Sequence, residues 1–308
     1  MQMYDLALAW NWEFDREFIF SIERECARRG VSTYRIDTGH LAETLARLAA
    51  GGLKFLSFFD RASDADPAFL PLSQWMEEHV VYYINPRHRV VHAVDKATMH
   101  LEFLSNGLHV PDTIILPPFH EQPEHRIDEK RLHRLGVPFV IKPANTTGGG
   151  TGVKLSAHTV SDIAEARREH KNDKYLIQEL ITPADLKGNR AWFRVYYAFG
   201  EIIPCWWNDQ THRYSILTEA QEKKYGLKML RNAVTTVQSI ALLDFFSSEI
   251  ALTEDKEFVL VDYVNEVCDM RLQSRYHDGA PDAIVHRIER LIAMRVARRL
   301  SRVSRKTE

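Results

Sequence analysis

The sequence predicts an α/β protein that begins with a small parallel α/β unit. Strand-like and helix-like patterns alternate through residues 1–95, which is typical of a parallel sheet with crossover helices. After this unit, a cluster of glycines lies between two strand-like runs, and strands and helices follow in mixed order. With 308 residues, the chain is long enough for two domains of roughly 150 residues each.

Composition and charge exclude several classes of protein. Lys and Arg number 40 and Asp and Glu 42, so the net charge of −2 argues against a protein that coats nucleic acid, which needs a basic excess. No apolar run reaches the roughly 18 residues of a membrane span, and the first residues lack the basic segment and cleavage site of a signal peptide. Three distant cysteines without a CxxC motif exclude a disulfide scaffold or a zinc ribbon, so a reduced cytoplasmic location is expected.

Within the first unit, short apolar runs predict strands and amphipathic spacing predicts helices. The run YDLALAW predicts a buried first strand, and apolar residues at helical spacing from Phe14 to Cys26 predict a helix that Gly30 ends. The turn after the first strand, Asn11-Trp12-Glu13, lacks the glycines of a dinucleotide-binding site. The expected strands are 4–10, 31–36, 55–59 and 80–84, and the expected helices are 13–29 and 38–50.

The rest of the chain mixes strands and helices. A helix is expected at 94–106, and a connector rich in Pro, His and charge follows, with a short helix at 129–135. Thr159 and Asp162 have the spacing of a capping box at the start of another helix. The last helix is amphipathic, and its apolar face is expected to pack against the rest of the protein. The remaining expected strands are 175–180, one or two within 191–207, 248–252 and 258–264, and the remaining expected helices are 219–243 and 282–303.

The segment PFVIKPANTTGGGTGVKL holds four glycines between two strand-like runs. A hairpin turn would account for one or two of them, whereas backbone N–H groups in a loop without Cβ atoms can close on phosphate oxygens. The loop lacks the Gly-Lys-Ser/Thr of a P-loop, and a strand rather than a dinucleotide-binding helix follows it. The sequence therefore predicts a flap over a triphosphate, with Lys142 beside it, because a lysine among apolar neighbours needs an anionic partner. The glycines are Gly148, Gly149, Gly150 and Gly152.

A second candidate site lies in the segment FFSSEIALTEDKEFVLVDYVNE. It is expected to form a hairpin in which Glu249 and Asp262 stand at comparable distances from the turn and so meet on one face. Two carboxylates with the amide oxygen of Asn265 are the hard ligands that Mg²⁺ needs beside nucleotide phosphates. The alternative, two exposed acids on an edge hairpin, is disfavoured by the apolar neighbours of Asp262.

Together these segments resemble the ATP-grasp superfamily, which includes D-alanyl-D-alanine ligase, glutathione synthetase and the ribosomal-protein glutamate ligases. The likeness spans nearly the whole chain and rests on AVDKATMHLEF, LHVPDT, VIKP with TTGGGTGV, YLIQELI and WFRVYYAFGEIIP, in this order. It implies the ATP-grasp fold with lobes of α+β structure. A pre-ATP-grasp domain would cover 1–93 and the ATP-grasp domain 94–308, with lobes 94–179 and 180–300 and the C-terminal helix 282–303.

The resemblance implies which residues bind the nucleotide. Lys96 and Lys142 would be the pair of nucleotide lysines, and the four glycines would form the flap. The backbone of a hinge would read the adenine edge, and Asp185 would hold the ribose hydroxyls. The hinge residues are Gln178, Glu179, Leu180 and Ile181.

The resemblance also implies catalytic and metal-binding residues. Arg194 fits the arginine aimed at the transferring phosphate, but Arg190 would share its strand face, which leaves this choice open. The family usually has Glu-x-Asn and then a Pro-Gly turn, whereas this chain has Asp-Tyr-Val-Asn and then EVCDMR. A one-residue bulge would keep both ligands on the metal. In the rebuilt loop, Arg271 and Asp269 are candidates for substrate contacts, and the metal ligands would be Glu249, Asp262 and Asn265.

The resulting prediction is an ATP-dependent carboxylate–amine ligase that uses ATP with Mg²⁺ or Mn²⁺. The γ-phosphate would pass to a substrate carboxylate, and an amine would displace it from the acyl phosphate, releasing ADP and phosphate. Two alternatives stay open: an ATP-grasp kinase, in which a hydroxyl keeps the phosphate, and a nucleotide-sensing module without turnover. The expected partners are a small-molecule carboxylate and amine, without a membrane or nucleic acid, and a homo-oligomer is left open.

Overall fold

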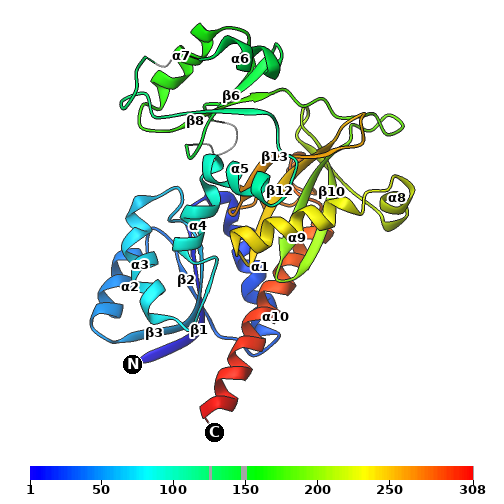
Figure 1. Cartoon of the computed structure of the whole chain (residues 1–308). Coiled ribbons are helices and arrows are strands. Elements are labelled where there is room, and N and C mark those ends of the chain that lie inside the picture. Colours follow the sequence, from blue (N-terminus) through cyan, green and yellow to red (C-terminus); the bar gives the residue numbers. More distant parts are fainter. Residues whose placement is uncertain (125–126, 147–150, 308) are drawn as a thin grey trace.

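The computed structural model describes residues 1–124, 127–146 and 151–307, whose strands form three sheets (Figure 1). A parallel sheet lies at the end of the molecule where both termini are found, and a four-stranded antiparallel sheet lies at the opposite end. The third, a five-stranded antiparallel sheet, shares a hydrophobic core with each of the other two. The expectation of an α/β protein that begins with a parallel unit is therefore confirmed.

The parallel sheet has the strand order β2-β1-β3-β4, as the alternation of strands and helices predicts. The expected helix 13–29 begins with a separate 3₁₀ turn, Glu13–Asp15, and a further helix, α3, lies between β3 and β4. The elements are β1 (Gln2–Trp10), α1 (Arg16–Ala27), β2 (Thr33–Ile36), α2 (Leu41–Ala49), β3 (Leu53–Arg61), α3 (Leu70–His79) and β4 (Tyr82–Ile84).

The four-stranded sheet has the order β5-β8-β6-β7, and the glycine loop lies between β6 and β7. The expected capping box is present at α7, where Thr159 Oγ1 accepts from Asp162 N and the Asp162 carboxylate accepts from Thr159 N. The elements are β5 (Thr113–Leu116), α6 (Glu129–Leu135), β6 (Phe139–Pro143), β7 (Lys154–Ala157), α7 (Val160–Glu169) and β8 (Tyr175–Glu179).

Two expected helices differ from the structure. The helix expected at 94–106 is α5 (Lys96–Ser105), and α4 (Arg87–Val94) precedes it. Asp95 separates them, because its extended backbone stops α4 while its carboxylate caps α5. The single helix expected at 219–243 is wrong: Gly226, with a φ of 68°, lies between α8 (Glu219–Lys224) and α9 (Met229–Ala241).

The five-stranded sheet has the order β11-β10-β9-β12-β13. The last helix, α10, runs beside α1 (Figure 1), and its Ile288 and Ile292 are buried with Phe18 and Ile22 of α1, so the expected docking is confirmed. Each such buried side chain contributes roughly 1.5–3 kcal/mol. None of the described helices is both long and apolar enough to cross a membrane. The elements are β9 (Trp192–Ala198), β10 (Glu201–Asn208), β11 (Arg213–Ile216), β12 (Phe245–Leu252), β13 (Phe258–Asn265) and α10 (Asp282–Thr307).

Candidate functional site

A row of three charged side chains crosses the five-stranded sheet. Arg194 on β9 lies opposite Glu249 on β12, and Glu249 lies opposite Asp262 on β13, so the three share one face. The Arg194 guanidinium forms an ion pair with Glu249, and the indole of Trp192 donates to the Oε2 of Glu249 at 3.0 Å. The prediction that Glu249 and Asp262 meet across the hairpin is confirmed.

Asn265 joins this face through an irregularity of β13. Ser247 lies opposite Asn265, and Glu249 lies opposite Asp262, so the interval on β13 is one residue longer than the interval on β12. This is the one-residue bulge considered for the Asp-Tyr-Val-Asn segment, and it brings Asn265 to the side of Asp262. With the Asn265 amide oriented so that both of its ends find partners, its oxygen accepts from Arg194 Nη1 at 3.3 Å.

Two lysines approach the row from other elements. Lys96, the first residue of α5, has its Nζ 3.9 Å from Asp262 Oδ1. Lys142 on β6 is buried, and its Nζ donates to the carbonyl oxygen of Val261 at 2.9 Å. A second register shift leaves Val261 without a residue opposite it on β12. We call the resulting set the charged cluster; it consists of Lys96, Lys142, Arg194, Glu249 and Asp262.

The members of the charged cluster change one another's titration. Burial lowers the pKa of Lys142 to about 8. The positive charge of Lys96 lowers this pKa further, whereas the negative charges of Asp262 and Glu249 raise it. Burial by itself would raise the pKa of Asp262, but Lys96, Lys142 and Arg194 outweigh it and lower this pKa. Three cations that face two carboxylates give a site with a net positive charge, suited to a polyanion such as a triphosphate.

The oxygen atoms of Asn265 and of the two carboxylates in the charged cluster fit a hard divalent cation. Glu249, Asp262 and Asn265 provide two carboxylates and an amide oxygen on one face, which are ligands that Mg²⁺ and Mn²⁺ prefer. Within the described residues, no three His, Cys, Asp or Glu side chains come together as a metal site. An ion held here would therefore need further oxygens from water or phosphate, as Mg²⁺ usually does.

The glycine loop is described only in part. Gly148, Gly149 and Gly150 lie outside the described residues. Gly152 has a φ of +73°, and a Cβ atom there would lie 3.0 Å from His170 Nε2 and 3.2 Å from Pro143 Cγ. Only glycine accommodates both this conformation and this close approach without strain.

The predicted hinge comprises the last two residues of β8 and the two residues that follow. The Glu179 N–H donates to the Asp112 carbonyl oxygen at 3.0 Å, and the Glu179 carboxylate accepts from Asp112 N at 2.9 Å. Leu180 is 43% exposed, and in the described part of the chain neither Leu180 nor Ile181 donates a backbone hydrogen bond. The backbone N–H groups of Leu180 and Ile181 therefore stay candidates for binding the adenine edge, whereas the buried Gln178 side chain donates to Thr113 and Tyr263.

Two further candidates are held by local partners. Asp185 accepts from Gly188 N at 2.8 Å and so caps a turn at the surface. Arg190 forms an ion pair with Asp209 at 2.8 Å. Of the two arginines, only Arg194 belongs to the charged cluster, and which of them contacts the transferring phosphate stays a prediction.

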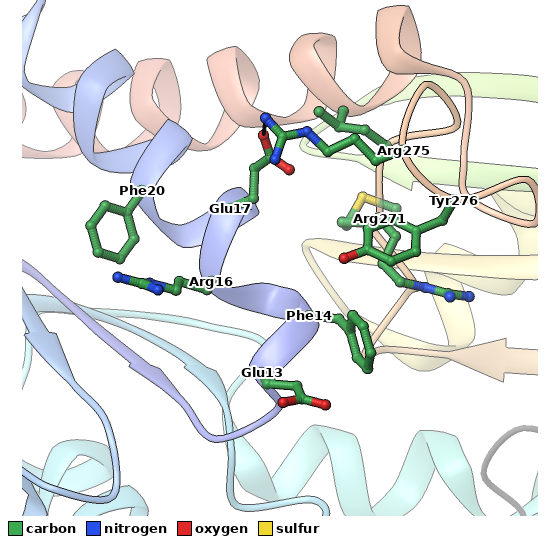
Figure 2. A pocket seen from close by; sticks show the side chains of 10 residues that line it. Glu13, Phe14, Arg16, Glu17, Phe20, Arg271, Arg275 and Tyr276 are labelled. Carbon is green, nitrogen blue, oxygen red and sulfur yellow. Dashed lines mark ion pairs between the residues drawn. The ribbon is translucent and has the colours of Figure 1, made fainter.

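Arg271 lies in a pocket of about 360 Å³ between the start of α1 and the loop after β13 (Figure 2). Its guanidinium pairs with Asp269 at 2.6 Å and Asp278 at 2.9 Å, and the rings of Phe14 and Tyr276 flank it. Both carboxylates neutralise this arginine, and among the described residues no ion pair joins it to the charged cluster. Its role in catalysis and substrate contact stays a prediction.

Sequence reasoning missed an ion pair that holds the loop after β13. Arg61, at the end of β3, is bonded to Asp15 at 2.7 Å, and each side chain is only 1% exposed. Arg61 also donates to the carbonyl of Cys268 at 2.8 Å, which ties this loop to the parallel sheet. Its partners lie 46 and 207 residues away in the sequence, so no local pattern could identify them.

No protein-family model and no curated protein matches this chain. Solved structures do. D-cycloserine synthetase DcsG is similar with a TM-score of 0.65 and 13% identity, over 96% of this chain and 100% of that one. The D-alanine–D-alanine ligase from Bacillus anthracis, complexed with ATP, is similar with a TM-score of 0.64 and 13% identity, over 97% of this chain and 99% of that one. A RimK domain ATP-grasp protein from Sphaerobacter thermophilus is similar with a TM-score of 0.62 and 20% identity, over 94% of this chain and 97% of that one. This chain therefore has the ATP-grasp fold.

Proposed function

We propose that this chain is an ATP-dependent carboxylate–amine ligase that binds ATP between its four-stranded and five-stranded sheets. The observation that carries the proposal is the charged cluster, in which cations from α5, β6 and β9 converge on two carboxylates. The names of the similar structures, a synthetase and a ligase, support a ligase over a sensor.

Each residue has a defined task in this reaction. Lys96 and Lys142 neutralise the phosphates of ATP, and Arg194 stabilises the phosphoryl group as it transfers. The backbone of Leu180 and Ile181 binds the adenine edge. When bound, Mg²⁺ or Mn²⁺ would neutralise further charge on the phosphate oxygens. The residues that would hold it are Glu249, Asp262 and Asn265.

The substrate itself carries the phosphoryl group. A carboxylate oxygen attacks the γ-phosphorus, the bond to ADP breaks, and an acyl phosphate forms. The amine nitrogen then attacks the acyl carbon, phosphate leaves, and the nitrogen loses a proton. Two thiols near the site do not compete as nucleophiles, because burial raises the pKa of Cys268 to about 11 and that of Cys205 to about 12.

We assign the remaining parts of the chain within this proposal as follows. Residues 1–93 form a pre-ATP-grasp domain, and residues 94–308 form the ATP-grasp domain. The glycine loop covers the phosphates, and Asp185 binds the ribose with the carboxylate oxygen that does not cap its own turn. Arg271 and Asp269 line the side where the acceptor enters.

Trapping with hydroxylamine tests the proposed reaction. The protein is incubated with Mg·ATP and pooled amino and carboxylic acids, and hydroxylamine is then added as a small general amine. A hydroxamate that appears in step with ADP and free phosphate is the expected result. ADP with a phosphorylated alcohol and no free phosphate would identify a kinase instead, and nucleotide binding without ADP would identify a sensor.

A further inference from the structure

Behind the charged cluster, a buried polar network reaches from Lys142 into the core between two sheets. The Lys142 ammonium lies 5.1 Å from the centre of the Tyr263 ring, which forms a floor under the charge. The Tyr263 hydroxyl is 2.7 Å from His100 Nδ1 and accepts from Gln178 Nε2 at 3.0 Å. Gln178 also donates to Thr113 Oγ1 at 2.9 Å. His100, Gln178 and Tyr263 are all buried.

The donors and acceptors of this network match when Tyr263 donates to His100. Gln178 Nε2 can only donate, so the Tyr263 oxygen accepts from it, and in this arrangement the Tyr263 proton goes to His100 Nδ1. This requires a neutral imidazole with its proton on Nε2. Burial, together with the nearby charge of Lys142, lowers the pKa of His100 to about 4, so the imidazole is neutral at pH 7. Both bonds hold the Tyr263 oxygen, so the side chain cannot swing away from Lys142 without breaking them.

The network joins the two sheets that would hold the nucleotide. Tyr263 belongs to β13 of the five-stranded sheet, whereas Gln178 and Lys142 belong to β8 and β6 of the four-stranded sheet. Gln178 pairs with Val140 in the register of β6, and Lys142 is two residues further along, so the Lys142 and Gln178 side chains lie on the same face. A single residue of one sheet therefore touches both of these side chains of the other.

We propose that Tyr263, supported by His100 and Gln178, is the positioning residue that fixes the Lys142 ammonium at the boundary between the two sheets. The ammonium has three donors, one of which goes to the Val261 carbonyl. With the ring beneath it, the remaining donors are held toward an incoming phosphate. Tyr263 touches no reacting atom itself. The inference rests on the proposed function, in which Lys142 binds a phosphate of ATP.

The test is Tyr263→Phe, which keeps the ring and removes only the hydroxyl. Calorimetry with the non-hydrolysable analogue Mg·AMP-PNP should show affinity weakened about tenfold, because small displacements of a positioning group have large effects. Tyr83→Phe is the matched control. Its hydroxyl is also buried and has two partners, Ser73 at 2.7 Å and Asp60 at 3.0 Å, but it lies in the parallel sheet. The control should lose as much thermal stability and keep its nucleotide affinity.

A pair of His100 variants makes the test independent of Tyr263. His100→Gln keeps an acceptor for the Tyr263 proton and should bind AMP-PNP better than His100→Leu. The double variant Tyr263→Phe/His100→Leu should be no weaker than the weaker single variant, because both remove the same bond. If Tyr263→Phe does not fold, the comparison of His100→Gln with His100→Leu still tests the proposal.

The outcomes separate this inference from the proposed function. Wild-type affinity in Tyr263→Phe, an equal loss in Tyr83→Phe, or additive losses in the double variant would each overturn the positioning role alone. A wild-type protein that does not bind AMP-PNP would overturn the proposed function, and the role of Tyr263 with it.

Discussion

Replacing Lys142 with methionine is expected to stabilise the nucleotide-free protein and to weaken its binding of ATP. Lys142 is only 6% exposed, and burial lowers its pKa from 10.5 to about 8. This difference corresponds to on the order of 3 kcal/mol by which the charged side chain destabilises the fold at pH 7. Methionine fills a similar space without a charge. The free energy of unfolding should rise by about 1–3 kcal/mol, less than the full amount because the Val261 carbonyl loses its donor.

The pH dependence of stability gives a second measure of the same effect. The pKa of Lys142 is lower in the folded chain than in the unfolded chain, so between about pH 8 and pH 10.5 only the unfolded chain holds this proton. The contribution of Lys142 to stability therefore rises with pH across this window. The advantage of Lys142→Met over the wild type should shrink over the same window, which urea denaturation at pH 7 and pH 10 measures.

Nucleotide binding should change in the opposite direction. Losing a charge-assisted contact to phosphate costs about 1.5–3 kcal/mol, or roughly 10- to 150-fold in Kd, which calorimetry with Mg·AMP-PNP measures. Lys54→Met, at an exposed lysine of β3, is the control and should change neither property. A Lys142→Met protein that unfolds at lower urea than the wild type at pH 7, or that binds the nucleotide equally well, would refute this reasoning.

Three further predictions concern the framework and the metal ligands. Asp15→Asn should lower the free energy of unfolding by about 3–5 kcal/mol in urea denaturation, because Arg61 is left charged and unpaired in the core; Asp15→Leu combined with Arg61→Met should recover most of the loss. Chelation by EDTA, or Asp262→Asn, should abolish phosphate release, and full turnover in either case would remove Asp262 from the metal ligands. Thr159→Ala should cost about 1 kcal/mol in thermal unfolding, because it removes the N-cap of α7.

Much of the fold could be predicted because the patterns that determine it are local. An apolar run such as YDLALAW is recognisable as a strand, and Thr159 with Asp162 is recognisable as a capping box, without any knowledge of their neighbours. The four-residue strands β5 and β11 were missed, because segments this short become strands only through the strand beside them. The break at Gly226 was missed because helices tolerate an isolated glycine, and only its φ shows that it ends one.

The sequence likewise predicts some parts of the candidate site and not others. The hairpin predicted Glu249 opposite Asp262, since the two are close in sequence and share one turn. The role of Tyr263 as a floor for Lys142 could not be predicted, because the two residues come from different sheets and the tyrosine reads as an ordinary core residue of a strand. For the region around Arg271, the sequence predicted only a rebuilt loop. It did not predict that two carboxylates neutralise the charge of Arg271.

By itself, the sequence determined which chemical groups are present and in what order: two lysines, a glycine loop, an arginine strand and an acidic hairpin. Only the tertiary structure decided which of them act together. Arg190 and Arg194 are equivalent in the strand pattern, yet Asp209 pairs with the first and Glu249 with the second. The physical reason is that charges interact across a few ångströms of space, and those distances are set by strand pairing and sheet packing between segments remote in sequence.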